Sequence, residues 1–379
     1  MVVPSWHRLE CFKLTNRKDT VARHSDQPRR RISAFAVSSF LAFALVLVTV
    51  VLPVPYMVET PGPVFNTLGK VKDTDEDVVE ITGAETYPTD GQLNMLTVGV
   101  VGGPDRHMSA LRALMGVLKR TETVVPTESM YPLDTTGEQV SQANTAQMTS
   151  SQDIATAAAL GELGMDYTVR LRVAEDPADG PARGKVSQGD TVLAINGKEV
   201  EGADALQTIH TEVEKGSPVE LRLESGGEQR TETIQPTKID GKHRMGVLLN
   251  QDFDFPVDVK FNLENIGGPS AGTVFALTII DKLTEGPLAG DKNVAGTGAI
   301  TADGTVQPIG GARQKVAAAD DAGSEYFLSP RDNCAEALDA ADNRDITVVR
   351  IDNLHAAKTA LEDIAEDRTS DLPSCSADR

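Results

Sequence analysis

The feature that most constrains this chain is a run of 21 residues, positions 32–52, that contains no charged side chain. At about 1.5 Å per residue, a helix of this length spans roughly 30 Å, the thickness of a bilayer's hydrocarbon core. A secretory signal has a shorter apolar core, of about 7 to 15 residues. The few serines and threonines in the run form no polar stripe along one helical face. The run therefore predicts a retained transmembrane helix at 32–52.

Charge is distributed unevenly on the two sides of this run. Residues 1–31 hold eight Lys or Arg and three acidic residues, a net +5, whereas the residues after position 52 hold 28 basic and 53 acidic residues, a net −25. Because basic flanks stay on the cytoplasmic side, we expect a single-pass cell-membrane protein with a cytoplasmic leader at 1–31 and the rest extracytoplasmic. The acidic balance argues against a nucleic-acid partner.

The three cysteines are interpreted in the light of this orientation. Cys11 would face the reducing cytosol, whereas Cys334 and Cys375 share the oxidising side and form an even pair. We predict a disulfide between Cys334 and Cys375, with two unrelated thiols as the alternative. No C-x-x-C pair occurs, so a zinc ribbon is excluded.

Four prolines at positions 53, 55, 61 and 63 stiffen the chain after the apolar run and exclude a helix there. Residues 93–101 are nearly all apolar and predict a buried strand. The apolar spacing over residues 108–118 predicts a helix. Residues 121–147 indicate a loop and then a helix, without recognisable chemistry. We predict an N-terminal extracytoplasmic region at 53–150.

Residues 180–200 have the pattern of a hairpin. An apolar run at 191–195 has the length of a strand, and Asn196-Gly197 supplies the positive φ angles of a type I′ turn. The segment resembles bacterial PDZ domains, which implies a PDZ domain at 151–238. PDZ domains add a peptide to a sheet edge beside a glycine-containing loop, here expected at Leu163-Gly164-Met165. Peptide binding and a structural or gating role stay open as alternatives.

Two motifs place a serine and a lysine 45 residues apart. Ser270 follows Gly267-Gly268-Pro269 and precedes an apolar helix, so we expect it at a helix N-terminus, where free backbone N–H groups stabilise an oxyanion. The four residues 267–270 are the predicted nucleophile turn and oxyanion site. A serine hydroxyl needs a base, and no histidine lies near these motifs, so a neutral Lys315 is the available base. Apolar residues after Lys315 indicate burial, which lowers a lysine pKa.

Three strings carry a family resemblance: GGPSAG at 267–272, VAGTGAI at 294–300 and PIGGARQK at 308–315. They resemble the proteolytic domain of Lon proteases, specifically membrane-anchored, PDZ-containing Lon-like proteins that lack an ATPase. The resemblance implies an α/β (α+β) domain of the ribosomal protein S5 domain 2-like fold, a Ser270–Lys315 dyad and a supporting Thr297. Gly267 departs from it, because many Lon enzymes carry an acidic residue at this position.

The expected function is an extracytoplasmic, membrane-anchored, ATP-independent serine endopeptidase acting on proteins or peptides, without a cofactor or metal. The sequence contains no G-x-x-x-x-G-K-[ST] string, so it gives no indication of an ATP site. The alternative is a catalytically silent PDZ and Lon-like scaffold that binds envelope proteins. Lon-type domains commonly form rings, so the resemblance also allows a homo-oligomer. The expected divisions are 1–31, leader; 32–52, transmembrane helix; 53–150, N-terminal region; 151–238, PDZ domain; 246–369, proteolytic domain; 370–379, tail.

Overall fold

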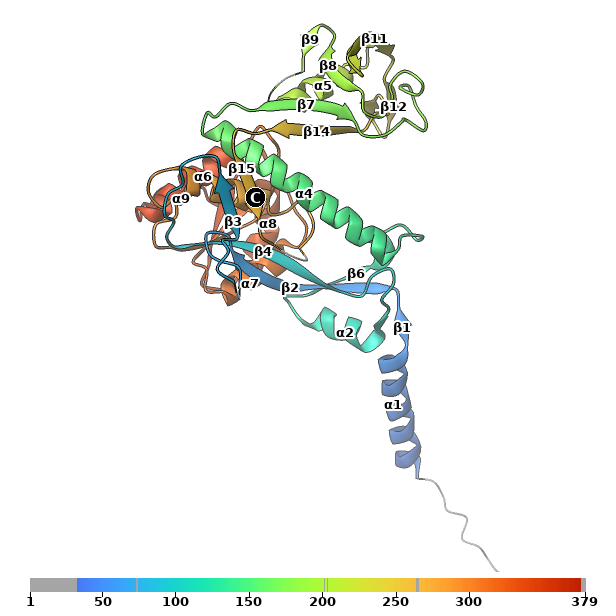
Figure 1. The fold of residues 1–379 in the computed structure, drawn as a ribbon. Helices are drawn as coiled ribbons and strands as arrows, with labels where there is room; N and C mark the ends of the chain where they lie inside the picture. The colour runs from blue at the N-terminus through green and yellow to red at the C-terminus, as the bar shows by residue number, and fades with distance from the viewer. Residues whose placement is uncertain (1–32, 73, 201, 203, 264–265, 376–379) are drawn as a thin grey trace, which may run out of the picture. The chain divides into compact units, whose positions relative to one another are not determined.

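The computed structural model describes residues 33–72, 74–200, 202, 204–263 and 266–375. The chain divides into two compact units, with the boundary between Thr49 and Val50. Helix α1 (Ala34–Val51) makes up most of the described part of the first unit (Figure 1). The predicted leader, with Cys11, and Ile32 lie outside the described residues. Within the described ranges, no helix meets the length and apolarity that a membrane crossing requires.

The second unit is built around a mixed six-stranded sheet in the order β20-β19-β16-β4-β2-β6. The first four of these strands run parallel, and β2 is antiparallel to both β4 and β6. Strand β4 confirms the strand predicted at 93–101. The bounds are β2 (Tyr56–Asn66), β4 (Gln92–Val101), β6 (Thr123–Pro126), β16 (Asn293–Gly296), β19 (Tyr326–Pro330) and β20 (Thr347–Ile351).

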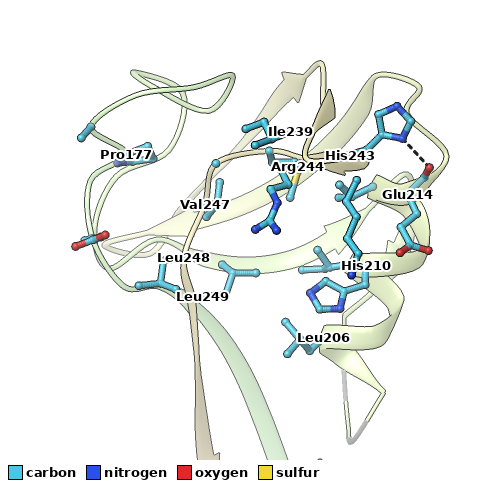
Figure 2. A pocket seen from close by; sticks show the side chains of 17 residues that line it. Pro177, Leu206, His210, Glu214, Ile239, His243, Arg244, Val247, Leu248 and Leu249 are labelled. Carbon is cyan, nitrogen blue, oxygen red and sulfur yellow. Dashed lines mark hydrogen bonds between the residues drawn. The ribbon is translucent and has the colours of Figure 1, made fainter. Parts of the chain in front are cut away.

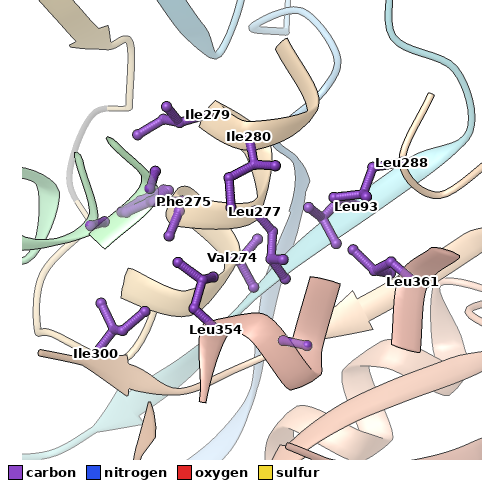
Figure 3. Packing of buried hydrophobic residues seen from close by; sticks show 14 of the residues in the cluster. Leu93, Val274, Phe275, Leu277, Ile279, Ile280, Leu288, Ile300, Leu354 and Leu361 are labelled. Atoms are coloured by element: carbon purple, nitrogen blue, oxygen red, sulfur yellow. The ribbon is translucent and has the colours of Figure 1, made fainter. Parts of the chain in front are cut away.

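Successive strand residues point to opposite sides of the sheet, so its apolar residues lie on both faces. Helices cover both of these faces. On one face, α4 (Gly137–Glu162), α6 (Gly272–Leu283) and α9 (Leu354–Ala365) bury their apolar side chains with Leu93 of β4. Figure 3 shows Leu277 of α6 gathered there with Leu93 and with Leu361 of α9. On the other face, α7 (Ala312–Asp321) and α8 (Cys334–Ala341) pack over Ala295 and Phe327.

A second sheet has its own apolar core and the strand order β11-β10-β8-β7-β14, with β9 paired to β8. Helix α5 (Ala205–Glu214) packs on it. The φ angles of 51° at Asn196 and 75° at Gly197 confirm the left-handed turn after β8. The strands are β7 (Thr168–Val173), β8 (Thr191–Ile195), β9 (Lys198–Glu199), β10 (Val219–Ser225), β11 (Glu228–Ile234) and β14 (Leu249–Asp254).

The remaining elements are short, and most are two-stranded pairs: β1 (Pro53–Val54) with β5 (Met108–Ser109), β3 (Val79–Thr82) with β15 (Asp258–Phe261), β12 (Thr237–Ile239) with β13 (Lys242–Arg244), and β17 (Ala299–Ile300) with β18 (Val306–Gln307). Helix α2 (Ala110–Leu118) confirms the helix predicted at 108–118. The other short helices are α3 (Thr127–Met130) and two 3-10 turns, Arg331–Asn333 and Thr369–Asp371.

Two of the expected divisions differ from the sheets in the structure. The region 53–150 supplies β2, β4 and β6 to the large sheet, so it shares a core with the predicted proteolytic domain. The sheet of the predicted PDZ domain also extends past residue 238, because β14 pairs with β7 over Leu249 to Asp254. In both cases the pairing joins strands far apart in the chain, and local periodicity does not show such pairing.

A disulfide joins Cys334, at the start of α8, to Cys375. Both side chains are buried in the core between α7 and the sheet. The bond closes a loop with a sequence separation of 41 residues. It therefore links the C-terminal segment covalently to α8.

Replacing both Cys334 and Cys375 with serine should lower the free energy of unfolding by about 2–4 kcal/mol, because the unfolded chain regains the entropy that the closed loop had removed. Urea unfolding of the variant and the parent, each with and without reductant, measures this difference. Reductant should destabilise the parent and leave the variant unchanged. A parent insensitive to a reductant that demonstrably opens the bond would contradict the prediction.

Candidate active site and peptide groove

Ser270 lies in the turn that leads into α6. Gly268 has a φ of 91°, a conformation that favours glycine, and Pro269 then fixes the backbone immediately before the serine. Ala271 is the N-cap of α6, and Gly272 is the first helical residue. A Cβ at Gly272 would lie 2.8 Å from Ile300 Cγ2, so the close packing of α6 against β17 requires glycine there. The prediction that Ser270 lies at a helix N-terminus is confirmed.

Lys315 approaches from the opposite face of the large sheet. It lies in the first turns of α7, where its backbone N–H donates to Gly311 O, and its side chain is only 2% exposed. Thr297 directly follows the carboxyl end of β16, between the two helices that provide Ser270 and Lys315. The three predicted residues therefore meet at the carboxyl end of β16, and sites commonly lie at the carboxyl ends of parallel strands.

The three side chains form one hydrogen-bonded group. Lys315 Nζ lies 2.8 Å from Ser270 Oγ and 2.9 Å from Thr297 Oγ1. The Thr297 hydroxyl donates its hydrogen to Ser270 O at 3.0 Å, so its oxygen accepts from the lysine. A neutral amine that donates to Thr297 keeps its lone pair for the serine hydroxyl. The arrangement thus orients Lys315 to accept a proton from Ser270 Oγ.

Burial lowers the pKa of Lys315 from its usual 10.5 to about 8, because the ammonium form loses its hydration. Burial is the only cause of this shift, and no neighbouring carboxylate offsets it among the described residues. About a tenth of the lysine is therefore uncharged at pH 7, and about half at pH 8. A neutral amine beside a serine hydroxyl is the chemical requirement for a Ser-Lys dyad.

Helix α4 holds the nucleophile turn in place, a role that sequence analysis did not assign to it. Gly268 N donates to Asn144 O at 3.1 Å, and Ser151 Oγ donates to Pro269 O at 3.2 Å. A Cβ at Gly267 would lie 2.6 Å from Asn144 Cβ. The close passage of α4 thus explains why glycine stands where many Lon enzymes carry an acid. Nothing in the polar sequence of this part of α4 signals the contact.

The same contact changes the expected oxyanion donors. The backbone N–H of Gly268 is already used by Asn144, and Pro269 has none, so neither can donate to an oxyanion in this conformation. Across the part of the chain that the structure describes, the backbone N–H groups of Gly267, Ser270 and Ala271 have no acceptor. Those of Ser270 and Ala271 lie at the positive end of α6, where an oxyanion is stabilised most.

A cavity of about 310 Å³ borders the turn on the α4 side. Most of its lining is apolar, and Pro269, the neighbour of Ser270, forms part of its wall. The lining residues are Ala146, Gln147, Ser150, Ser151, Ile154, Pro269 and Ile300.

A second cavity, of about 730 Å³, lies between α5 and the segment 242–249 (Figure 2). Leu206 and His210 of α5 form one wall, and residues 247–249 form the other. Strand β14, which starts at Leu249, is the last strand in the order of its sheet. An extended peptide can therefore pair with its free edge.

The position of this groove corrects the expected glycine loop. Leu163-Gly164-Met165 does not line the cavity, whereas Gly246, with a φ of 76°, lies in its wall directly before β14. The edge strand beside α5 is the last strand of this sheet along the chain, not the first, so its loop follows α5 in sequence. Over the described residues, no cluster of His, Cys, Asp or Glu could hold a metal ion.

Comparison with known proteins matches the region around Ser270 to a protease family. Residues 264–362 match the family described as the Lon protease (S16) C-terminal proteolytic domain. Lon protease of Vibrio parahaemolyticus is 32% identical over 190 residues, which cover 47% of this chain and 24% of that protein. Lon protease 2 of Herpetosiphon aurantiacus is 42% identical over 89 residues, which cover 23% of this chain and 11% of that protein. The chain therefore spans about a quarter or less of these relatives.

Solved PDZ domains of SdrC-like proteins also show a limited likeness to the chain. The Listeria monocytogenes domain is 23% identical with a TM-score of 0.19, and the match covers 21% of this chain and 85% of that one. The Listeria innocua domain is 21% identical with a TM-score of 0.19, and the match covers 21% of this chain and 92% of that one. The matched region contains Ser270, Thr297 and Lys315, and its similarity to Lon proteases supports a serine peptidase domain there.

Replacing Lys315 with methionine should remove a specific pH dependence of stability. The folded lysine titrates near 8 and the unfolded one near 10.5, so the unfolded state binds more protons between these values. The parent's free energy of unfolding should therefore gain about 3 kcal/mol from this lysine as pH rises from 8 to 10.5. Chemical unfolding at pH 7, 9 and 10.5 measures this rise, which the Lys315→Met variant should lack. Parallel pH profiles would show that Lys315 is not desolvated.

Proposed function

We propose that this protein is a membrane-anchored, extracytoplasmic serine endopeptidase that works without ATP. Ser270 is the nucleophile, Lys315 is the general base, and Thr297 orients the lysine. The observation that supports this most directly is the 2.8 Å contact between Lys315 Nζ and Ser270 Oγ, around a lysine that is 2% exposed. That contact joins a nucleophile to a base whose pKa suits proton transfer near neutral pH.

The proposed reaction divides peptide hydrolysis into two steps. Ser270 Oγ attacks the peptide carbonyl carbon while Lys315 Nζ takes the hydroxyl proton, and the backbone N–H groups of Ser270 and Ala271 hold the oxyanion. The lysine then gives its proton to the departing amine, which leaves an acyl ester on Ser270. Lys315 next takes a proton from water, which attacks the ester, and returns that proton to Ser270 Oγ.

Sequence supports the proposed location outside the cytoplasm. The uncharged run at 32–52 separates a basic leader from a strongly acidic remainder, as in a single-pass protein with a cytoplasmic N-terminus. The proposed span includes Ile32, which lies outside the described residues, whereas α1 as described has 18 residues. The Cys334–Cys375 bond suits an oxidising compartment.

The groove beside α5 gives the peptidase a second contact with its substrates. Figure 2 shows the Arg244 guanidinium and the His210 ring directed into it, among the apolar side chains of Leu206, Val247 and Leu249. A peptide strand paired with β14 would bury apolar side chains against α5 and place an acidic group or a terminal carboxylate near Arg244. The PDZ-like domain thereby recruits or gates unfolded substrates.

Activity assays on full-length protein separate the enzyme from a catalytically silent scaffold. Ser270→Ala and Lys315→Ala should each lower kcat for an unfolded protein substrate by on the order of 10⁴-fold or more, because each removes one half of the dyad. Circular dichroism and unfolding curves check that both variants are folded. The parent's kcat/KM should rise with pH up to about 8 and then level off, as the lysine loses its proton. Equal cleavage by all three proteins would leave the scaffold as the better description.

Charge reversal at Arg244 tests the groove. Arg244→Glu should raise KM for an unfolded protein substrate by about tenfold, because one charge-assisted contact is lost, and leave its kcat unchanged. A short peptide that reaches only Ser270 should be cleaved as by the parent. Arg183→Glu, at an exposed arginine outside the cavity, is the matched control. If Arg183→Glu and Arg244→Glu shift KM alike, the groove does not bind substrate.

A further inference from the structure

Helix α2 turns its large apolar side chains outward. Leu114, Met115, Val117 and Leu118 are 55%, 51%, 69% and 72% exposed. The face toward the sheet carries Gly116 instead, where a Cβ would lie 2.9 Å from Val124 Cγ2 of β6. A surface helix usually buries such a stripe, and a contiguous exposed one marks an interaction surface. We call these four residues the α2 stripe.

The α2 stripe lies next to the end of the uncharged run. Ala110 N, at the start of α2, donates to Leu52 O at 3.0 Å, and β5 immediately before it pairs with β1 through Pro53 and Ser109. Nine helical residues extend about 14 Å, so the whole stripe lies within about that distance of Leu52 along the helix axis. The position where the run ends thus fixes the position of the stripe.

A second exposed apolar group is tied to the same few residues. Thr127 N, at the start of α3, donates to Pro55 O at 3.1 Å, and Tyr56 pairs with Pro126. Met130 and Leu133, which follow, are 51% and 86% exposed. Two separate segments therefore expose large apolar side chains beside positions 52–56.

We propose that the α2 stripe inserts into the lipid–water interface of the bilayer on the side where residue 52 emerges. This inference rests on the proposed anchor at 32–52. A span that ends at Leu52 brings α2 to the level of the headgroups, where an apolar helix face is stabilised by acyl chains. Arg120 directly follows the stripe and suits an anionic headgroup, whereas Lys119 forms an ion pair with Glu122 at 2.8 Å. The stripe holds the catalytic unit close to the membrane surface.

Lipid contact can be read residue by residue on the full chain. Single cysteines are placed at Leu118, at Leu45 in the run and at Glu228, the exposed first residue of β11, each in a Cys11→Ser background with the native disulfide intact. Each cysteine carries an environment-sensitive fluorophore. The proteins are inserted in nanodiscs of phosphatidylcholine and phosphatidylglycerol, with or without doxyl-labelled lipid. We expect a blue-shifted, strongly quenched signal at Leu118, intermediate between those at Leu45 and Glu228.

Each other outcome has a distinct meaning. Quenching at Leu45 with a water-like, unquenched signal at Leu118 overturns the inference and leaves the anchor intact. A blue shift at Leu118 without lipid quenching also overturns it, because protein, such as a second copy of the chain, then covers the stripe. Absence of quenching at Leu45 removes the anchor itself, and this inference falls with it.

Discussion

The chemistry that we propose for this protein depends on a lysine amine held in a nearly dry position between two hydroxyl groups. Lys315 Nζ contacts Ser270 Oγ and Thr297 Oγ1, and only 2% of the lysine remains exposed. Lost hydration makes the ammonium form costly and lowers the pKa to about 8. The Thr297 hydroxyl donates to Ser270 O, so its oxygen accepts an N–H of the lysine. The lone pair of the neutral lysine is then directed at Ser270 Oγ. Burial and hydrogen-bond direction together make an ordinary side chain a base.

The large sheet provides this setting because helices pack on both of its faces. Ser270 comes from the turn before α6 on one face, and Lys315 comes from α7 on the other. They meet beside Thr297, where β16 ends. Helix α4 adds a constraint from the N-terminal half of the chain. Asn144 O accepts a hydrogen bond from Gly268 N, and Asn144 Cβ leaves no room for a side chain at Gly267. The free N–H groups of Ser270 and Ala271 are the donors at the positive end of α6.

Local patterns were sufficient where neighbouring residues decide the structure. The strand at β4, the helix at α2 and the left-handed turn at Asn196-Gly197 follow from periodicity and turn chemistry. Patterns failed where distant segments pair. The region 53–150 joins the sheet that carries Thr297, and the glycine expected at Leu163-Gly164-Met165 lies instead at Gly246, before β14. The apolar spacing of α2 also resembles that of a buried helix, yet its stripe faces outward.

The sequence by itself determined the reactive residue types and their order, because a glycine-proline turn before Ser270 and an apolar flank after Lys315 act over a few residues. It also determined the uncharged run and the separation of charge around it. Only the tertiary structure decided which groups meet: the 2.8 Å approach across 45 positions, the α4 contacts that define the oxyanion donors, and the groove beside β14. These depend on packing between distant segments, which local propensity does not encode.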